Sequence, residues 1–475
     1  MKTIQLFVLG FVSWIQIGYS QIPPDLIGLL DSIVYNAIPA GNANTGVVVG
    51  VCAPGQWSWT TASGYSISGL TNGYPSELAK PDSKFRIGSI SKMFIATSIM
   101  QLEEAGLLNI SDDISLYLRP SLLYDTIHYN TLVTIRNLLD HTSGFADLAT
   151  NDSCRSAAFT DLTRNFTLEE AIYCGCIQGK LFPPNFSWSY SNTNYSILSM
   201  IIEEVTGLSS YEYITSNIII PLGLFNTEVP STDQIVSPHM GCYWDLPPLL
   251  DLTVVDASLY QGWADIVSTT EDLFLFYDAL RKGDLVNNTS FDKMMTVSPS
   301  SYDYGLAIDF YKIDGDDYYG HSGEVGNTSG MFFADISTSF LPNGYYLTYN
   351  YNYQGINSSV ILEQPIHELL KSYIEDSSSQ DTILLHSLND IYNHDFVLFP
   401  NPSYGKCYAL VNLPTSTRVE VDILDITGRN VVQFISTVNS GKLIIPDLDL
   451  ENGTYHIRLT SIHGRGIKSL VITDL

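Results

Sequence analysis

The order of strand-like and helix-like segments along residues 21–373 is the feature that most constrains how this chain folds. Short runs of β-branched and aromatic residues lie near both ends of this stretch, with long apolar helical patterns between them. A sheet made from such a chain must join strands from its two halves, which predicts an α+β fold rather than repeated βαβ units. The predicted strands are Gly46–Cys52, Tyr304–Ile313, Tyr318–His321, Ser329–Ala334 and Tyr345–Asn350.

Three segments between these strands have a helical period. Ser89–Leu108 is apolar on nearly every face, which predicts a buried helix, and Gly106 is placed to end it. Tyr195–Val205 and Glu271–Leu280 are flanked by residues that can cap a helix. Asp314–Asp317 lacks the spaced ligands of a calcium loop and is predicted to be a hairpin turn.

The chain changes character after residue 373. Residues 374–392 include a polar run that cannot pack a core, which predicts a linker. Apolar and polar residues then alternate with a period of two, as in Arg418–Ile423, and turn residues recur at short intervals. Residues 393–475 are therefore predicted to form a small all-β, Ig-like sandwich.

Charge and cysteine content exclude several classes of function. The chain has 22 Lys and Arg residues and 50 Asp and Glu residues, so its net charge is -28. A chain this acidic lacks the electrostatic attraction that supplies most nucleic-acid affinity. Six cysteines in 475 residues are too few for a disulfide scaffold, although Cys154 is near enough to Cys174 and Cys176 to staple a loop. The spacing needed for a zinc site is missing, so we expect no metal and no cofactor.

The N-terminus has the pattern of an export signal. Met1-Lys2 gives a positive start, Leu6–Ile17 is apolar, and Gly18 and Ser20 are small residues at a suitable cleavage point. Residues 1–20 are therefore predicted to be a signal peptide. The apolar run is too short to span a bilayer, which takes about 20 residues, so we expect no membrane segment in the mature chain.

The pattern Ser-x-x-Lys occurs three times, and only one copy is placed for chemistry. Ser89 and Lys92 open the long buried helix, whereas the copies at Ser290 and Ser403 follow polar or turn sequences. Residues three apart share a helix face, so the Lys92 amine can reach the Ser89 hydroxyl. A buried lysine with a lowered pKa can activate a serine nucleophile. The alternative is a helix-capping serine followed by a surface lysine.

Two further motifs can complete such a site. Tyr190-Ser191-Asn192 offers a phenol that could shuttle a proton if cations lower its pKa, and an amide that could bind a substrate amide. His321-Ser322-Gly323 ends a strand, where a substrate could lie along the edge and the backbone N–H groups of Glu324 and Ser89 could form an oxyanion hole. Taken alone, each motif could equally be structural.

The three motifs in this order resemble the serine β-lactamase and penicillin-binding-protein superfamily, in the branch of class C β-lactamases, D-alanyl-D-alanine carboxypeptidases and esterases. Phe85–Gly88, Leu138–Gly144 and Ile266–Leu273 are similar to family segments as well. The resemblance covers about residues 25–373. It implies an antiparallel sheet flanked by helices, an all-helical lobe, and an active site between them.

The resemblance also implies roles for individual residues. Ser89 would form an acyl-enzyme, with Lys92 and Tyr190 moving protons and Asn192 holding the acyl amide, while His321, Ser322 and Gly323 would bind substrate. His321 stands where the β-lactamases usually have lysine. This departure favours an exported peptidase or esterase acting on a small molecule or peptide. A β-lactamase, or a catalytically silent surface binding module with the same fold, is the alternative.

The C-terminal region has a resemblance of its own. Phe399–Pro402, Ile423–Arg429 and Asn452–Tyr455 resemble the type A C-terminal sorting domain of the type IX secretion system. This implies passage through the periplasm to the cell surface or medium, with the secretion machinery as partner. A generic Ig-like accessory domain is the alternative.

Overall fold

The computed structural model describes residues 22–38, 45–67, 76–118, 132–230, 235–244, 249–301 and 303–373, and seven strands of the C-terminal region. The predicted signal peptide, residues 1–20, and the predicted linker, residues 374–392, lie outside the described residues.

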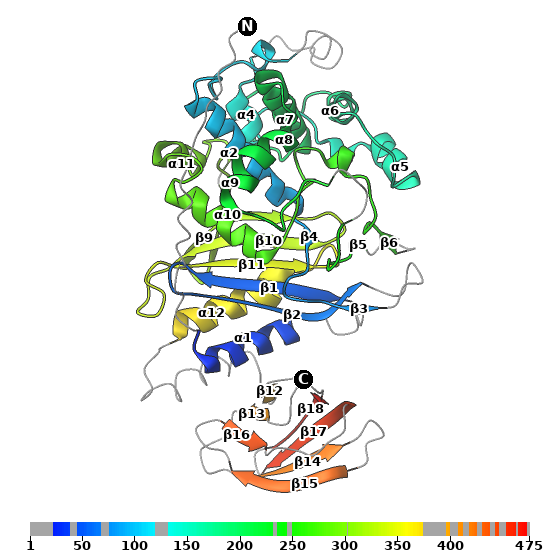
Figure 1. Ribbon diagram of the computed structural model, residues 1–475, viewed down its shortest axis with the longest axis vertical. Helices are drawn as coiled ribbons and strands as arrows, with labels where there is room; N and C mark the ends of the chain where they lie inside the picture. Colours follow the sequence, from blue (N-terminus) through cyan, green and yellow to red (C-terminus); the bar gives the residue numbers. More distant parts are fainter. Residues whose placement is uncertain are drawn as a thin grey trace.

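A seven-stranded antiparallel sheet in the order β3-β2-β1-β11-β10-β9-β8 forms the centre of the large domain (Figure 1). The N-terminal strand β1 pairs with β11, so the two halves of the chain close the sheet as predicted. The strands are β1 Gly46–Ala53, β2 Trp57–Ile67, β3 Glu77–Leu78, β8 Asp309–Ile313, β9 Asp316–Gly323, β10 Thr328–Asp335 and β11 Tyr345–Tyr351.

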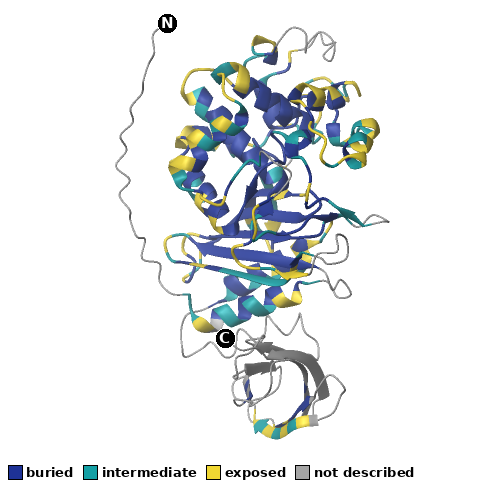
Figure 2. Ribbon diagram, turned by 45° about the vertical axis from the view of Figure 1, so that its right-hand side comes forward, coloured by how far each residue is buried: buried dark blue, intermediate teal, exposed yellow. Residues whose placement is uncertain are grey.

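Helices cover both faces of this sheet, which explains why every residue of β1 is buried (Figure 2). Val47, Val49 and Val51 face a core shared with α1, Pro24–Asn36, and α12, Gln364–Ser372. Val48 and Cys52 face the larger core on the other side, toward α10. Close approach on that side leaves no room at Gly50, where a Cβ would lie 2.8 Å from the Phe274 ring.

The helical lobe lies beyond that second face (Figure 1). The three predicted helices are confirmed as α2, α7 and α10. The helices on this side are α2 Ser91–Glu104, α4 Ile135–Leu139, α5 Asp152–Thr160, α6 Leu168–Cys176, α7 Asn192–Thr206, α8 Ser210–Ile214, α9 Ile220–Leu222, α10 Thr270–Lys282 and α11 Asn288–Met294.

The predicted end of the first helix is confirmed by its backbone geometry. Gly106 has a φ of 68°, and its N–H donates to the carbonyl of Glu103 while the N–H of Leu107 donates to that of Leu102. These two bonds are a Schellman motif, which needs a left-handed residue and therefore favours glycine.

One predicted strand is wrong over half its length. Tyr304–Ile308 forms a tight turn in which the N–H of Gly305 donates to the carbonyl of Ile308, and Ala307 has a φ of 61°. Only Asp309–Ile313 is extended, and the Asp314-Gly315 turn then leads into β9 as predicted. Strand β2, whose run of Ser, Thr and Gly carries little apolar alternation, was missed.

A disulfide joins Cys154 to Cys174 and so ties α5 to α6. The predicted loop staple is therefore confirmed, with Cys174 rather than Cys176 as the partner. The thiols of Cys52 and Cys242 are buried, which raises the pKa of each to about 12.

The C-terminal strands form two antiparallel sheets, as predicted for a sandwich. One sheet contains β12 Phe396–Phe399, β13 Cys407–Val411 and β16 Lys442–Ile445. The other contains β15 Asn430–Thr437, β14 Arg418–Leu424, β17 Gly453–Ser461 and β18 Gly464–Ile472. Val419, Val421, Ile423 and Leu443 are buried. Arg418 and Glu420 are exposed, as the alternation predicts, whereas Asp422 departs from the pattern and is buried.

In the described part of the chain, no helix combines the length and apolar character needed to cross a bilayer.

Candidate active site

Ser89 lies in a sharp turn between strand and helix. The turn starts from β4, Phe85–Arg86, and passes through a 3-10 turn at Gly88–Ile90 before α2 begins at Ser91. Gly88 has a φ of 57°, and a Cβ there would lie 2.5 Å from the amide nitrogen of Glu324. Glycine is needed on both counts. Ser89 therefore precedes the α-helix instead of starting it, and the Glu324 amide lies beside this turn, as the predicted oxyanion hole requires.

Lys92 is completely buried one turn after Ser89. Its Nζ donates to Ser89 Oγ at 2.9 Å, to Asn192 Oδ1 at 2.7 Å and to the Trp263 carbonyl at 3.0 Å. Burial lowers the pKa of Lys92 to about 7, against the opposing effect of three carboxylates. These belong to Asp147, Asp265 and Asp309.

Tyr190 faces the same serine, as the motif predicted, but its electrostatics differ from the expectation. The ring lies 4.9 Å from Lys92 Nζ. Removal from water raises the pKa of Tyr190 well above 10, and the hydrogen bond with the Ser89 side chain offsets this only in part. A pKa lowered by cations, the condition attached to this motif, is therefore not met, and the phenol is neutral and available as a proton donor.

Asn192 begins α7 and is held on two sides. Its Oδ1 accepts from Lys92, and its Nδ2 and backbone N–H both donate to the carboxylate of Asp147, at 3.2 and 3.1 Å. Asp147 thus fixes the amide that orients the lysine. Contact between Asn192 and a substrate amide stays a prediction.

His321, Ser322 and Gly323 end strand β9 at the cleft. A Cβ on Gly323 would lie 2.0 Å from the Ile87 carbonyl oxygen, so only glycine allows the strand to approach the Ser89 turn. His321 is buried, with Nδ1 2.6 Å from the Ser322 carbonyl oxygen and Nε2 3.0 Å from the Tyr304 hydroxyl. Burial lowers the pKa of His321 to about 3, so the ring is neutral. Its role as a substrate contact stays a prediction.

A cleft of about 550 Å³ opens over these groups. The three motifs line this cleft together with six apolar side chains, those of Leu148, Ala158, Phe159, Trp244, Leu252 and Leu259. Two carboxylates, Asp309 and Glu324, also line it. Burial away from water, and to a lesser extent the charge of Asp303, raises the pKa of Asp309 to about 7. Arg155, also in the lining, pairs with Asp152 at 2.6 Å.

The other Ser-x-x-Lys copies do not form a second site in the described chain. Lys293 extends from α11 to pair with Glu103 at 2.8 Å, and Ser403 lies outside the described residues. Over the described ranges, no group of three His, Cys, Asp or Glu residues is placed to hold a metal ion.

Several residues of the site had no recognisable signal in the sequence. Asp147, Trp263, Tyr304 and Asp309 lie in segments without a motif and meet the nucleophile only through the fold. His141 did lie in a segment similar to the family, but nothing indicated its position beside Tyr190.

A serine hydroxyl bonded to a buried lysine of lowered pKa, with a neutral phenol beside it between a sheet and a helical lobe, is an arrangement that can support nucleophilic catalysis. The chain belongs to the β-lactamase family, whose profile matches residues 35–361. The profile of a secretion system C-terminal sorting domain matches residues 397–473.

Two of the relatives by sequence are named as penicillin-binding proteins. The chain is 34% identical over 249 residues to penicillin-binding protein 4* of Bacillus subtilis, covering 49% of this chain and 52% of that protein. It is 32% identical over 231 residues to the putative penicillin-binding protein PbpX of the same species, covering 48% and 54%. The chain thus spans about half the length of these relatives.

The similar structures include amide-cleaving enzymes. A D-stereospecific amidohydrolase from Streptomyces sp. superposes with a TM-score of 0.60 at 25% identity, covering 72% of this chain and 97% of that one. A D-amino acid amidase from Ochrobactrum anthropi SV3 gives a TM-score of 0.60 at 23% identity, with 73% and 98% covered. The second likeness shows the fold alone.

Proposed function

We propose that this protein is an exported serine hydrolase that cleaves an amide or ester through an acyl-enzyme on Ser89. The observation that carries the proposal is the 2.9 Å hydrogen bond between Ser89 Oγ and Lys92 Nζ, at a lysine whose pKa is lowered to about 7. Near neutral pH a large fraction of this lysine is uncharged, and the uncharged amine can accept the serine proton.

The residues can carry out both halves of the reaction. Ser89 Oγ bonds to the substrate carbonyl carbon as its proton passes to Lys92, and the backbone amides of Ser89 and Glu324 receive the oxyanion. The intermediate collapses and the bond to the leaving group breaks. Tyr190 protonates that group and is reprotonated by Lys92. A water then attacks the ester carbonyl and gives its proton to the same pair. The bond from that carbon to Ser89 Oγ breaks, the pair returns the proton to Oγ, and the acid product leaves.

The charges in the cleft favour a substrate without a carboxylate. Glu324 and, above its raised pKa of about 7, Asp309 supply negative charge, whereas His321 is neutral and Arg155 pairs with Asp152 at the surface. The apolar side chains in the lining suit an apolar group on the substrate. An amidase or esterase acting on a neutral or cationic substrate fits these charges better than a β-lactamase, because a β-lactam presents a carboxylate.

A second candidate is a carboxypeptidase acting on peptides that end in D-alanyl-D-alanine. The relatives named penicillin-binding proteins, at 34% and 32% identity, favour it. It requires the cleft to accept a terminal carboxylate despite Asp309 and Glu324.

Hydrolysis of a substrate panel by the full chain tests the proposal. The panel contains an amino acid amide, a short p-nitrophenyl ester, a chromogenic cephalosporin and a D-Ala-D-Ala peptide. Ser89→Ala should abolish turnover and labelling by a fluorophosphonate. Ser98→Ala, which removes a buried hydroxyl bonded to Phe94 on the same helix, should keep both. A folded protein with neither turnover nor labelling would overturn the proposal and favour a catalytically silent binding module.

Export is tested through the C-terminal domain. If type IX secretion carries this protein, deleting residues 393–475 should leave the rest in the periplasm of the producing cell. Release of the truncated protein into the medium at the normal level would contradict this route.

A further inference from the structure

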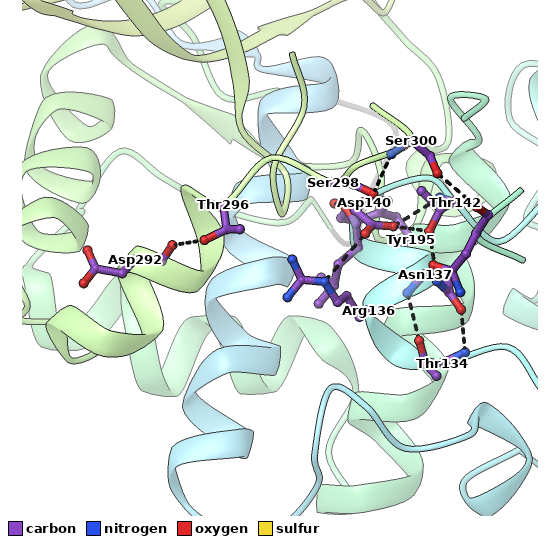
Figure 3. Close-up of polar contacts among 12 residues, drawn as sticks. Thr134, Arg136, Asn137, Asp140, Thr142, Tyr195, Asp292, Thr296, Ser298 and Ser300 are labelled. Atoms are coloured by element: carbon purple, nitrogen blue, oxygen red, sulfur yellow. Dashed lines mark hydrogen bonds and ion pairs between the residues drawn. The ribbon is translucent and has the colours of Figure 1, made fainter. Parts of the chain in front are cut away.

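The loop that carries His141 is held in a conformation that side chains seldom adopt. His141 has a φ of 60° and is completely buried. Its two neighbours fix the turn (Figure 3), with the Thr142 hydroxyl donating to Asp140 Oδ1 at 2.6 Å and Asn137 Nδ2 donating to that hydroxyl at 2.9 Å. Strained residues persist where their surroundings determine them, often at functional sites.

The contacts of His141 determine which of its nitrogens carries the proton. Nδ1 lies 3.1 Å from the backbone N–H of Ser191, which can only donate. It also lies 3.2 Å from Asn194 Nδ2, whose orientation follows from the 2.7 Å bond that Ser143 donates to Asn194 Oδ1. Nδ1 is therefore an acceptor, and the proton of the neutral ring is on Nε2.

His321 has the opposite arrangement. Its Nδ1 lies 2.6 Å from the Ser322 carbonyl oxygen, which can only accept, so Nδ1 carries the proton. Nε2 is then an acceptor for the Tyr304 hydroxyl at 3.0 Å. The same hydroxyl oxygen lies 3.2 Å from His141 Nε2 and accepts a hydrogen bond from its N–H. A chain of hydrogen bonds, each donating in the same direction, thus runs from His141 through Tyr304 to His321.

We infer that His141 and Tyr304 are positioning residues that hold His321 neutral and protonated at Nδ1. This hydrogen-bond chain starts at the backbone N–H of Ser191, which lies between Tyr190 and Asn192. It ends on β9, beside the Glu324 amide of the proposed oxyanion hole. It therefore ties together the two elements that flank Ser89. The tautomers stand independently of activity, while their catalytic consequence rests on the proposed function.

The groups around His321 explain why this fixation matters. Protonation of its Nε2 would remove the acceptor for Tyr304 and place a charge near the lysine base, breaking the chain at its end. Titratable groups face the ring from every element packed around it. They are Lys92 on α2, Tyr190 before α7, Asp309 on β8, Tyr304 in the turn before β8, and, through the Tyr304 hydroxyl, His141 and Tyr195.

Nitrogen-detected NMR of the full chain, with its nine histidines labelled with ¹⁵N, tests the inference without any substrate. His141→Gln and His321→Gln assign the two signals. We expect His141 protonated only at Nε2 and His321 only at Nδ1, with neither titrating between pH 8 and 5. The same tautomer in both rings, or a His321 signal that titrates in this range, would overturn the inference.

Tyr304→Phe tests the bridging hydroxyl. Because the phenol donates to Nε2 and so stabilises the neutral ring, the variant should raise the pKa of His321 and lower kcat/KM about tenfold. Tyr277→Phe is the matched control, since it removes another buried hydroxyl, bonded to the Tyr319 carbonyl at 2.8 Å. If Tyr304→Phe and Tyr277→Phe had the same His321 pKa and the same kcat/KM, the Tyr304 hydroxyl would be a structural contact only, and the inference would be overturned. The tautomers should be unchanged in Ser89→Ala, which is expected to lose turnover. The tautomer measurement can therefore succeed or fail independently of the proposed function.

Discussion

The central sheet carries a buried histidine and tyrosine cluster on each face, and only one of them lies at the proposed active site. On the lobe side, His141 and His321 share the hydroxyl of Tyr304. On the opposite side, His367 of α12 accepts through Nδ1 from the Tyr318 hydroxyl at 2.7 Å. Strand β9 supplies Tyr318 to one cluster and His321 to the other, because alternate side chains point to opposite faces.

The two clusters differ in the charges beside the histidine and in access to solvent. The Nε2 of His367 bonds to Asp316 at 2.9 Å, and Asp316 pairs with Lys371, so charge is balanced at the surface. His321 lies near a buried lysine and a cleft of about 550 Å³. Buried polar residues alone therefore do not mark a site. A cavity, a nucleophile and a base with a lowered pKa do.

Lys92→Met should have the largest effect and act on activity alone. It removes the base while keeping a side chain of similar length, so we expect turnover to fall by at least about a thousandfold. Removing a buried cation should leave the free energy of unfolding unchanged or higher. Hydrolysis assays and urea denaturation measure the two.

Lys293→Met is the control for this change, because it alters the surface lysine of another Ser-x-x-Lys copy, which pairs with Glu103. Its turnover should match the wild type. A strong loss of stability in Lys92→Met would show that the lysine supports the fold as well as the chemistry.

His367→Ala should lower stability and leave activity unchanged, which is the reverse of the effect expected for Lys92→Met. The ring is completely buried and has partners on both nitrogens, so we expect a loss of about 2–4 kcal/mol in the free energy of unfolding. The kcat/KM of the folded protein should not change. Gln364→Ala, on the exposed side of the same helix, should stay within about 0.5 kcal/mol of the wild type. A drop in kcat/KM for His367→Ala would mean that the two faces are coupled.

The sequence predicted the lobe-side cluster better than the far one, for a physical reason. Ser89, Lys92, Tyr190 and His321 belong to short motifs, because their chemistry needs fixed spacing on a helix or strand. His367 lies in an ordinary amphipathic helix, and its partners come from strands that precede it by at least 22 residues. Contacts of this kind depend on strand register and helix packing, which a single sequence does not show.

The same limit applies within the active site and in the fold. The closure of the sheet by β1 and β11 could be predicted, because β1 is a continuous apolar run and β11 is rich in tyrosine, which favours strands. The turn at Tyr304–Ile308 could not, since its apolar residues suit a strand and only the left-handed Ala307 redirects the chain. That turn places Tyr304 between the two histidines.

The two clusters should also differ in how acid affects stability. The pKa of His321 is about 3 in the folded protein and near 6.5 when unfolded, so the unfolded chain binds the proton first as pH falls. The free energy of unfolding should therefore decrease below pH 6.5, by about 1–2 kcal/mol between pH 7 and 5. His321→Asn should remove this part of the slope.

His367→Asn should remove less of it. Burial also lowers the pKa of His367, but Asp316 opposes that shift, whereas Lys92 reinforces the shift at His321. Denaturant unfolding of the wild type and both variants at pH 7 and 5 gives the slopes. Equal slopes for the two variants would remove the electrostatic distinction between the faces.

Asp309→Asn should have the smallest effect, and one that only the lobe side can show. Asp309 is one of the three carboxylates that raise the pKa of Lys92, so its neutralisation should lower that pKa further. Because Lys92 must be uncharged to accept the serine proton, the acid limb of the kcat/KM profile should move slightly to lower pH. The gain should be about 1.5-fold near pH 7 and shrink by pH 6, because Asp309, whose pKa is about 7, is itself mostly protonated there. Glu324→Gln, which neutralises the other carboxylate of the cleft, should leave this limb in place but also relieve the repulsion of anionic substrates. If Asp309→Asn moved the limb to higher pH, the carboxyl would be acting as a proton acceptor itself, and the assignment of Lys92 as the base would have to be revised.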